Sequence, residues 1–196
     1  MRCLLLSLVL IVIASTLSIG QRSDYVEDFT LPNLTSGNEF SLKDYSSASM
    51  IVVIFTSLHC PYAQLYTDRI TDLIGAFEND KVRFVLINPT NPTTHPEDAS
   101  EKLVQALEKY EWTVPFLVDQ NQRVARLLGA EKTPEVLVLA WQRNSFKTIY
   151  QGAIDDNPQV ASDVHHHYLR DFLTAQRADQ SAPLRTTPAT GCRIKS

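Results

Sequence analysis

One cysteine of this sequence stands where a thiol can be reactive. Cys60 lies in the segment FTSLHCPYAQLY, directly after an apolar run of strand length, 50–55, and directly before a helical pattern that begins at Pro61. The first turn of a helix has N–H groups without a backbone partner, and these groups stabilise negative charge on a sulfur beside them. The pattern therefore predicts a reactive thiolate, although most free cysteines in proteins are buried and inert.

The sequence offers Cys60 a distant partner and no local one. A Cys-x-x-Cys motif would place the second thiol at position 63, which is Ala63. Without the first 20 residues the remaining cysteines are Cys60 and Cys192. About sixteen residues link Gln176 to Cys192, and they reach roughly 50 Å when extended, whereas a domain of this size has a radius of gyration of roughly 16 Å. Cys192 can therefore resolve an intermediate on Cys60, form a permanent structural disulfide, or have no partner within the chain.

Two further features accompany Cys60. Thr133 and Pro134 directly precede the strand-like run EVLVLAW. A proline that opens a strand can be cis and can bring a backbone edge close to the sulfur, whereas an ordinary trans proline in a loop is the alternative. His59 is the neighbour of Cys60, so it can stabilise the thiolate or point into solvent.

Other polar clusters favour structural roles. His165–His167 suggest a metal site, but consecutive residues of a helix are about 100° apart, so three adjacent side chains cannot converge on one ion. Asp155 and Asp156 are typical of a turn and a helix cap. A copper site that combines Cys60 with a histidine is a remote alternative. We expect that the function requires no metal and no organic cofactor.

The composition indicates one globular domain that enters the secretory pathway. The 196 residues are 44% apolar, which suffices for a core, and the net charge of -4 without a basic cluster excludes nucleic acid as a partner. Residues 1–20 combine Arg2, an apolar run over 4–14 and small residues, as in a cleavable signal peptide, and the run is short for a membrane span. We expect a secreted or periplasmic protein without a membrane span, an uncleaved anchor being the alternative. Asn33 begins a glycosylation sequon.

The apolar pattern after residue 20 predicts alternating strands and helices. Continuous apolar runs of strand length indicate strands covered on both faces, and apolar residues three and four apart indicate helices with one buried stripe. The expected strands are a pair around the turn at 36–38, then 50–55, 82–88, 115–119, 135–141 and 147–152, and the expected helices are 61–77, 97–110, 124–130 and 158–176, the last with Val160 and Val164 facing inward. This order is typical of a layered α/β domain whose parallel sheet has an antiparallel edge.

The composition changes from Arg177 onward. The segment RADQSAPLRTTPATGCRIKS is polar and interrupted by prolines, so we expect an extended tail that carries Cys192 and does not pack as an element. The chain then divides into a signal peptide at 1–20, a folded domain at 21–176 and a tail at 177–196.

From about Asp24 to Lys195 the chain resembles the redoxin-type thioredoxin-fold proteins of the alkyl hydroperoxide reductase and thiol-specific antioxidant superfamily. The resemblance is carried, in order, by IVVIFTSLHCPYAQLYTDRI, VRFVLINPTNPTTHPED, TPEVLVL, YQGAIDDNP, HHYLRDFL and GCRIK. It implies a thioredoxin-like three-layer α/β fold, with a central mixed sheet between helices and an N-terminal hairpin extension. It also implies that Cys60 is the nucleophile, that Pro134 is cis and faces it, and that the turn at 152–153 lies beside the site.

Departures from the family motifs narrow the activity. Thioredoxins carry Cys-x-x-Cys and a tryptophan before the first thiol, where this chain has Ala63 and His59, so self-contained dithiol chemistry is excluded. Peroxiredoxins carry Pro-x-x-x-Thr-x-x-Cys, in which the hydroxyl and an arginine orient the peroxide. Ser57 fits the hydroxyl position, Val53 stands at the proline position, and no arginine is assigned.

The expected function is that of a thiol-dependent oxidoreductase. Cys60 attacks a disulfide or a peroxide, and Cys192 or an external thiol resolves the product. The alternatives are a peroxidase similar to peroxiredoxins, and a redox-inactive binding module in which the disulfide is only structural. The expected partners are protein thiols or disulfides, or a small peroxide, and an external thiol reductant. The expected site residues are Cys60 and Cys192 as catalytic groups, Thr133 and Pro134 for substrate binding, and His59 and Ser57 as supporting groups.

Overall fold

The computed structural model describes residues 25–79, 81–180, 182 and 186–194. The predicted signal peptide lies outside the described residues. None of the helices in the described part of the chain has the length and apolar character needed to cross a bilayer.

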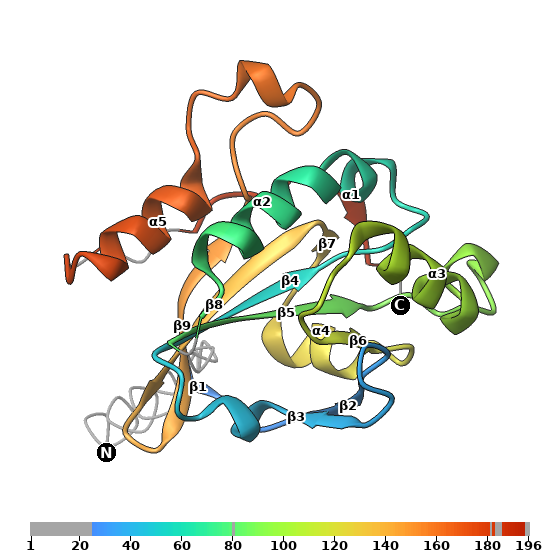
Figure 1. Cartoon of the computed structure of the whole chain (residues 1–196), viewed down its shortest axis with the longest axis horizontal. Helices are drawn as coiled ribbons and strands as arrows, with labels where there is room; N and C mark the ends of the chain where they lie inside the picture. Colours follow the sequence, from blue (N-terminus) through green and yellow to red (C-terminus); the bar gives the residue numbers. More distant parts are fainter. Residues whose placement is uncertain (1–24, 80, 181, 183–185, 195–196) are drawn as a thin grey trace, which may run out of the picture.

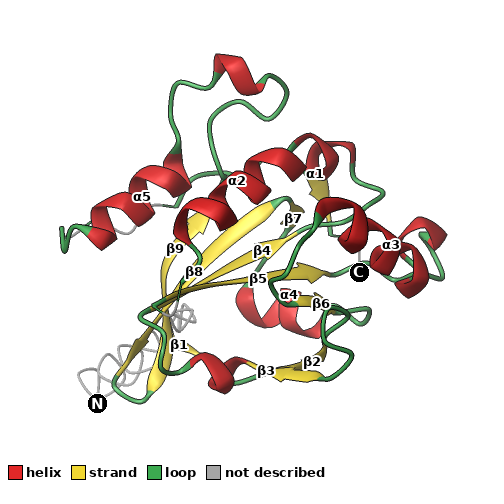
Figure 2. Ribbon diagram, in the orientation of Figure 1, coloured by secondary structure: helices red, strands yellow, loops and turns green. Residues whose placement is uncertain are grey.

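A central sheet of six strands organises the domain, in the order β1-β9-β8-β4-β5-β6 (Figures 1 and 2). The strands are β1 Tyr25–Val26, β2 Thr30–Pro32, β3 Glu39–Ser41, β4 Met50–Phe55, β5 Val82–Asn88, β6 Phe116–Val118, β7 Lys132–Thr133, β8 Glu135–Gln142, β9 Ser145–Gly152 and β10 Cys192–Arg193. The helices are α1 Pro61–Leu65, α2 Thr67–Phe77, α3 Ser100–Tyr110, α4 Arg123–Leu128 and α5 Tyr168–Arg177, with short 3-10 helices at Leu42–Tyr45, Pro96–Asp98 and Ala161–Asp163.

The strand β4 lies between β8 and β5 in the sheet. Every one of its side chains is apolar and buried, as expected for a strand that is covered on both faces. It pairs in parallel with β5 and antiparallel with β8, and β5 pairs in parallel with β6. The hairpin of β8 and β9 and the short β1 complete the antiparallel side. The predicted mixed α/β sheet with its antiparallel edge is confirmed.

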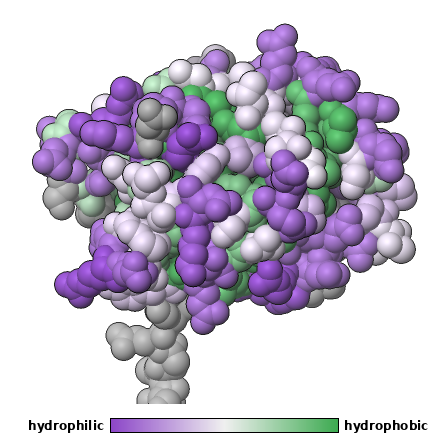
Figure 3. Space-filling view, turned by 60° about the horizontal axis from the view of Figure 1, so that its bottom comes forward, coloured by the Kyte–Doolittle hydropathy of each residue, from purple (hydrophilic) through white to green (hydrophobic). Residues whose placement is uncertain are grey.

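Helices cover both faces of this sheet, which gives the three layers of a thioredoxin-like fold. On one face, residues of α2, α3 and α5 pack together with alternate side chains of β4 and β5 (Figure 1). On the other face, α4 and the hairpin of β2 and β3 pack on the remaining side chains. The surface in Figure 3 is mostly hydrophilic, with apolar side chains visible between the hydrophilic ones.

Asn33, directly after β2 in the hairpin of β2 and β3, is only 9% exposed, and its carboxamide oxygen accepts the N–H of Thr35, so its side chain is part of the turn.

The predicted helix over 158–176 is partly wrong. α5 begins only at Tyr168, and Val160 is 49% exposed instead of facing inward. The side-chain oxygen of Asn157 accepts the N–H groups of Gln159 and Val160 at 3.1 and 2.9 Å. These local bonds compete with helical ones, so the chain turns instead. His165–His167 consequently precede the helix, and the argument from helical spacing does not apply to them.

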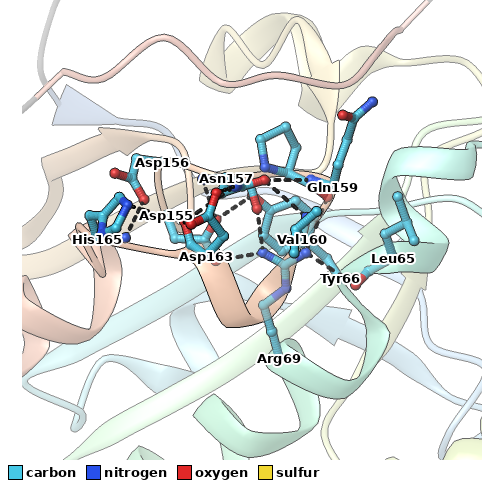
Figure 4. A network of polar contacts seen from close by, with 11 residues as sticks. Leu65, Tyr66, Arg69, Asp155, Asp156, Asn157, Gln159, Val160, Asp163 and His165 are labelled. Atoms are coloured by element: carbon cyan, nitrogen blue, oxygen red, sulfur yellow. Dashed lines mark hydrogen bonds and ion pairs between the residues drawn. The ribbon is translucent and has the colours of Figure 1, made fainter.

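A buried polar network holds this loop against α2 (Figure 4). Arg69 binds the carboxylate of Asp155 at 2.8 Å and stacks on the ring of Tyr66 at 3.8 Å. The hydroxyl of Tyr66 donates to the same carboxylate at 2.6 Å, and Arg69 also donates to the carbonyl oxygens of Asn157 and Pro158. Burial, together with the hydrogen bond to Asp155, raises the pKa of the Tyr66 hydroxyl, so it stays neutral and remains a donor.

The helix predicted over 61–77 is divided into α1 and α2, and Tyr66 is the residue between them.

The C-terminal segment packs on the domain, contrary to the prediction that it forms no element. β10 pairs antiparallel with β7, with Cys192 opposite Thr133. Lys132 donates from its ammonium group to the carbonyl oxygen of Ala189 at 2.6 Å, and the hydroxyl of Thr187 accepts the N–H of Ala153 at 3.0 Å. Backbone pairing and polar side-chain hydrogen bonds, neither of which requires apolar side chains, therefore place this segment, which explains why its polar composition misled the prediction.

The docked segment approaches β7 so closely that only glycine fits at position 191. A Cβ atom on Gly191 would overlap the carbonyl oxygen of Thr133. We predict that Gly191→Ala disfavours the docked form by about 1–3 kcal/mol, as overpacking of a tight contact does. Since docking brings Cys192 to Cys60, the formation constant of their disulfide should fall roughly 5- to 150-fold. Equilibration in a thiol–disulfide redox buffer measures it.

Gly75→Ala is the matched control for this variant. Gly75 lies in α2 with nothing within 4 Å of an added Cβ, so the formation constant should not change. An unchanged constant in Gly191→Ala would contradict the close approach described above.

Arg69→Ala tests the network of Figure 4. It leaves the buried Asp155 carboxylate without its cation, and we expect the free energy of unfolding to fall by roughly 2–3 kcal/mol, less than for a fully enclosed pair because Arg69 is partly exposed. Tyr66→Phe removes one hydrogen bond and should cost about 1 kcal/mol. Urea unfolding followed by circular dichroism gives both values, and equal losses in the two variants would argue against the ion pair.

Candidate active site at the Cys60–Cys192 disulfide

Cys60 and Cys192 form a disulfide across 132 residues of sequence, with their Cα atoms 5.8 Å apart. Cys60 is the N-cap residue of α1 and is 0% exposed, whereas Cys192 is partly exposed. The two residues therefore differ in access, since only Cys192 is partly exposed. Ala63, at the place of a local second thiol, is buried in α1.

The backbone of Thr133 passes directly beside this disulfide. Its carbonyl oxygen lies 3.0 Å from the sulfur of Cys60, and the peptide bond from Thr133 to Pro134 is cis. The expected close backbone edge and cis proline are thus present. β10 pairs with the edge of β7, so in the disulfide form an external peptide cannot pair with this edge.

His59 is fixed by a buried carboxylate instead of pointing into solvent. Its Nδ1 atom binds Asp98, which is 0% exposed and also accepts the N–H of Leu58 at 2.6 Å and a carboxamide N–H of Asn88 at 2.9 Å. Nδ1 carries the proton of this bond if Asp98 is ionised, so Nε2 is then the nitrogen that can accept a proton or a metal ion. The carboxylate sets the orientation and tautomer of the ring.

Ser57 faces His59 in this arrangement. Its hydroxyl oxygen lies 3.2 Å from Nδ1 of His59. A peroxidatic site would need this hydroxyl for the substrate. Val53 is fully buried in β4, as the apolar pattern of that strand requires.

Two residues of the site, Asp98 and His95, were missed by the sequence analysis. Asp98 was included in a predicted helix over 97–110, whereas it ends the 3-10 helix that precedes α3. The ring of His95 stacks on that of His59, with centroids 3.8 Å apart and planes 8° apart. Both lie in the short segment between the end of β5 at Asn88 and the start of α3 at Ser100. An imidazole and a carboxylate soon after a strand that neighbours β4 are the signal that could have found them.

The partly exposed side of the disulfide opens into a pocket of about 950 Å³. His59, His95 and Cys192 line it, together with Arg126 and Arg193, while Cys60 does not. A molecule in this pocket therefore lies beside Cys192 and an oriented imidazole. The structure brings together all of the predicted site residues, namely Cys60, Cys192, Thr133, Pro134, His59 and Ser57.

The triple histidine lies in a different environment. His165 is an exposed residue whose Nε2 atom lies 3.6 Å from Asp163, and the ring of His166 stacks on Tyr168. Among the described residues, the group of three donors close enough to hold one metal ion is instead His59, His95 and Glu97.

Comparison with known proteins agrees with this fold. An uncharacterized conserved protein from Geobacillus kaustophilus is 28% identical, with a TM-score of 0.79 over 88% of this chain and 90% of that chain. A hypothetical protein from Sinorhizobium meliloti is 27% identical, with a TM-score of 0.77 over 87% of this chain and 91% of that one. A peroxidoxin from Mycobacterium tuberculosis shares the fold at 20% identity and a TM-score of 0.56, over 82% and 98% of the two chains. No curated protein matches the sequence.

The AhpC/TSA family matches residues 23–156. This range contains Cys60, Asp98 and the cis Pro134, and it ends before Cys192. Because the match covers more than half of the chain, and because the α/β sheet and its helices have the thioredoxin-like arrangement, this protein belongs to the AhpC/TSA family of redoxins.

Proposed function

We propose that this protein is a thiol-dependent oxidoreductase in which Cys60 and Cys192 form the redox couple. The observation that carries the proposal is the disulfide between Cys60, which is fully buried at the start of α1, and Cys192, which is partly exposed and lines a pocket. The family supplies the reaction class, since AhpC/TSA membership suggests thiol and peroxide substrates. We keep the expected location, secreted or periplasmic, as part of the proposal.

The first half-reaction oxidises the protein. In the reduced form the thiolate of Cys60 attacks a substrate disulfide X–S–S–X, which forms a mixed disulfide on Cys60 and releases X–S⁻. The thiolate of Cys192 then attacks the sulfur of Cys60 and releases the second X–S⁻. Two electrons pass from the two protein thiols to the substrate. The unpaired N–H groups in the first turn of α1 stabilise the attacking thiolate.

The docked segment supports the role of Cys192 as the resolving thiol. Its hydrogen bonds at Thr187, Ala189 and Ile194 involve neither of the two sulfur atoms. A thiol held near its target reacts as if at high concentration, so resolution by Cys192 competes well with external thiols. The tail must still move to admit substrate to Cys60, because Cys60 is fully buried in the disulfide form.

The second half-reaction starts at Cys192. An external thiolate R–S⁻ attacks the partly exposed sulfur of Cys192, and Cys60 leaves as a thiolate. A second R–S⁻ then attacks R–S–S–Cys192, which releases R–S–S–R and the reduced protein. We assign to Nε2 of His59 the proton of the incoming R–SH, because His59 lines the same pocket as Cys192 and Asp98 holds its other nitrogen.

Peroxide reduction is the second candidate. Cys60 would attack ROOH to give a sulfenic acid and ROH, and Cys192 would convert the sulfenic acid into the disulfide and water. The observation in its favour is Ser57 at the hydroxyl position. Its oxygen lies close to His59 instead of being available to a peroxide, which is why we place disulfide exchange first.

Mass spectrometry of the full chain in a Cys3→Ser background tests the redox couple. After reduction, a stoichiometric small disulfide should restore the Cys60–Cys192 bond within minutes. In Cys192→Ser the same reagent should remain attached to Cys60, because the resolving thiol is absent. In Cys60→Ser the only remaining thiol is that of Cys192, and we expect it to take up the reagent no faster than an ordinary exposed cysteine.

The outcomes separate the candidate functions. Restoration by hydrogen peroxide but not by the disulfide would establish the peroxidase, and a sulfenic acid would then be trapped on Cys60 in Cys192→Ser. A bond that resists mild reductant, or a reduced Cys60 that neither oxidant attacks, would contradict both and leave a binding module with a structural disulfide.

Asp98→Asn tests whether His59 accepts the proton of the incoming thiol. The asparagine keeps an acceptor for the backbone N–H of Leu58 but no longer fixes the proton on Nδ1 of His59. We predict that reduction of the disulfide by a small thiol slows by on the order of 10-fold or more. Stopped-flow kinetics measures the rate, and thermal unfolding shows whether the domain stays intact.

Asp163→Asn provides the control for this prediction. Asp163 is an exposed acid beside His165, so its replacement should leave the reduction rate unchanged. A normal rate in a well-folded Asp98→Asn variant would remove His59 from the proposed proton transfer.

A further inference from the structure

We infer that His59, His95 and Glu97 form a binding site for one divalent transition-metal ion, with Zn²⁺ as the representative of the class. One ligand atom from each residue lies within 4.8 Å of the other two. His59 and His95 line the pocket beside the disulfide. The binding site itself does not depend on the proposed redox function.

The donor set suits a borderline metal ion. Two imidazole nitrogens and one carboxylate oxygen occur together at zinc sites that keep a fourth position open. Ligand atoms around tetrahedral zinc lie about 3.4 Å apart, since each is roughly 2.1 Å from the metal. The three atoms here therefore need to approach one another by about 1 Å or a little more. The side chains of His95 and Glu97 are 32% and 49% exposed, so they have room to make this movement.

His59 is already oriented as a metal ligand. Metal-bound histidines usually donate their second ring N–H to a carboxylate, which fixes the ring and makes the ligating nitrogen more basic. Asp98 is such a carboxylate, since it binds Nδ1 of His59 and is itself held by Leu58 and Asn88. The Nε2 atom of His59 is then the ligating nitrogen.

The second imidazole is held next to the first by ring stacking. The rings of His59 and His95 are nearly parallel, with centroids 3.8 Å apart, so the two imidazoles lie face to face. A ring nitrogen binds a metal in the plane of its ring, so the partly exposed His95 must tilt out of the stack for both rings to bind one ion. Glu97 lies two residues after His95 and brings a carboxylate oxygen to 3.7 Å from Nδ1 of His95. Two acidic residues, Asp98 and Glu97, thus lie beside the two imidazoles.

Direct ligation must provide the affinity, because the pocket as a whole is not acidic. Arg126 and Arg193 also line it, and their charges oppose a cation. An ion attracted only by a general negative field would not remain here. This consideration favours a metal that binds imidazole strongly, such as Zn²⁺ or Cu²⁺, over Ca²⁺ or Mg²⁺.

Occupancy of this site would slow the reduction of the disulfide. A metal ion on Nε2 of His59 takes the nitrogen that we assign to proton transfer. This consequence rests on the proposed function, whereas the binding itself does not. A metal that binds without slowing reduction therefore leaves the site in place and argues against the role of His59 in the redox reaction.

Zinc binding to the disulfide form of the full chain, in the Cys3→Ser background, tests the inference. Both remaining sulfurs are bonded to each other in this form and cannot ligate the ion. Competition with a chromophoric zinc chelator should show one high-affinity equivalent. His95→Ala should weaken binding by about 100-fold or more, since loss of a ligand exceeds the roughly 10- to 100-fold cost of losing an outer-shell partner. Glu97→Gln should weaken it less than His95→Ala.

His165→Ala is the matched control, because it removes an exposed histidine with a neighbouring acid at another place. It should leave the affinity unchanged. NMR adds a readout that needs no variant, because zinc should shift the ring signals of His59 and His95 and leave those of His165–His167 in place. Binding that survives His95→Ala, binding that His165→Ala removes, or no binding at all would overturn the inference.

Discussion

The contact between the C-terminal segment and the strand before the cis proline determines the character of the site. β10 pairs with β7, and Gly191 permits an approach that any side chain at that position would prevent. This pairing brings Cys192 to Cys60, covers the sulfur of Cys60 and occupies the edge that an external peptide would use. A chain that lacks a second thiol in the first turn of its helix has thereby obtained one from 132 residues away.

As a consequence, the two cysteines of the disulfide differ in their surroundings and in their exposure. Cys60 lies at the junction of a fully buried strand and a short helix, where the backbone provides unpaired N–H groups and solvent is excluded. Cys192 lies on a segment held by backbone bonds, at a pocket with oriented polar groups. In the proposed reaction this difference in exposure gives thiol exchange a direction, because the external thiol attacks Cys192 and Cys60 leaves.

Three further residues, Asp98, His95 and Glu97, surround the imidazole of His59. Asp98 is enclosed beneath His59 and ties together the loop that carries Cys60 and the end of β5, through Leu58 and Asn88. His95 and Glu97 extend this group into the pocket. We propose the same imidazole, that of His59, for proton transfer and for metal binding, and these two uses exclude each other.

The sequence by itself determined the layered α/β fold and the place of Cys60, because continuous apolar runs and helix starts are local signals. A proline before a strand left Pro134 open between cis and trans, and the family resemblance implied the cis form that the structure has. The sequence did not determine where α5 begins, since the side chain of Asn157 captures N–H groups that a helix would use. Only the tertiary structure decided that the polar tail docks and that Cys192 bonds to Cys60, and it alone placed Asp98 beneath His59. These outcomes depend on backbone edges and on long-range contacts between segments, which leave no periodic pattern in the order of the residues.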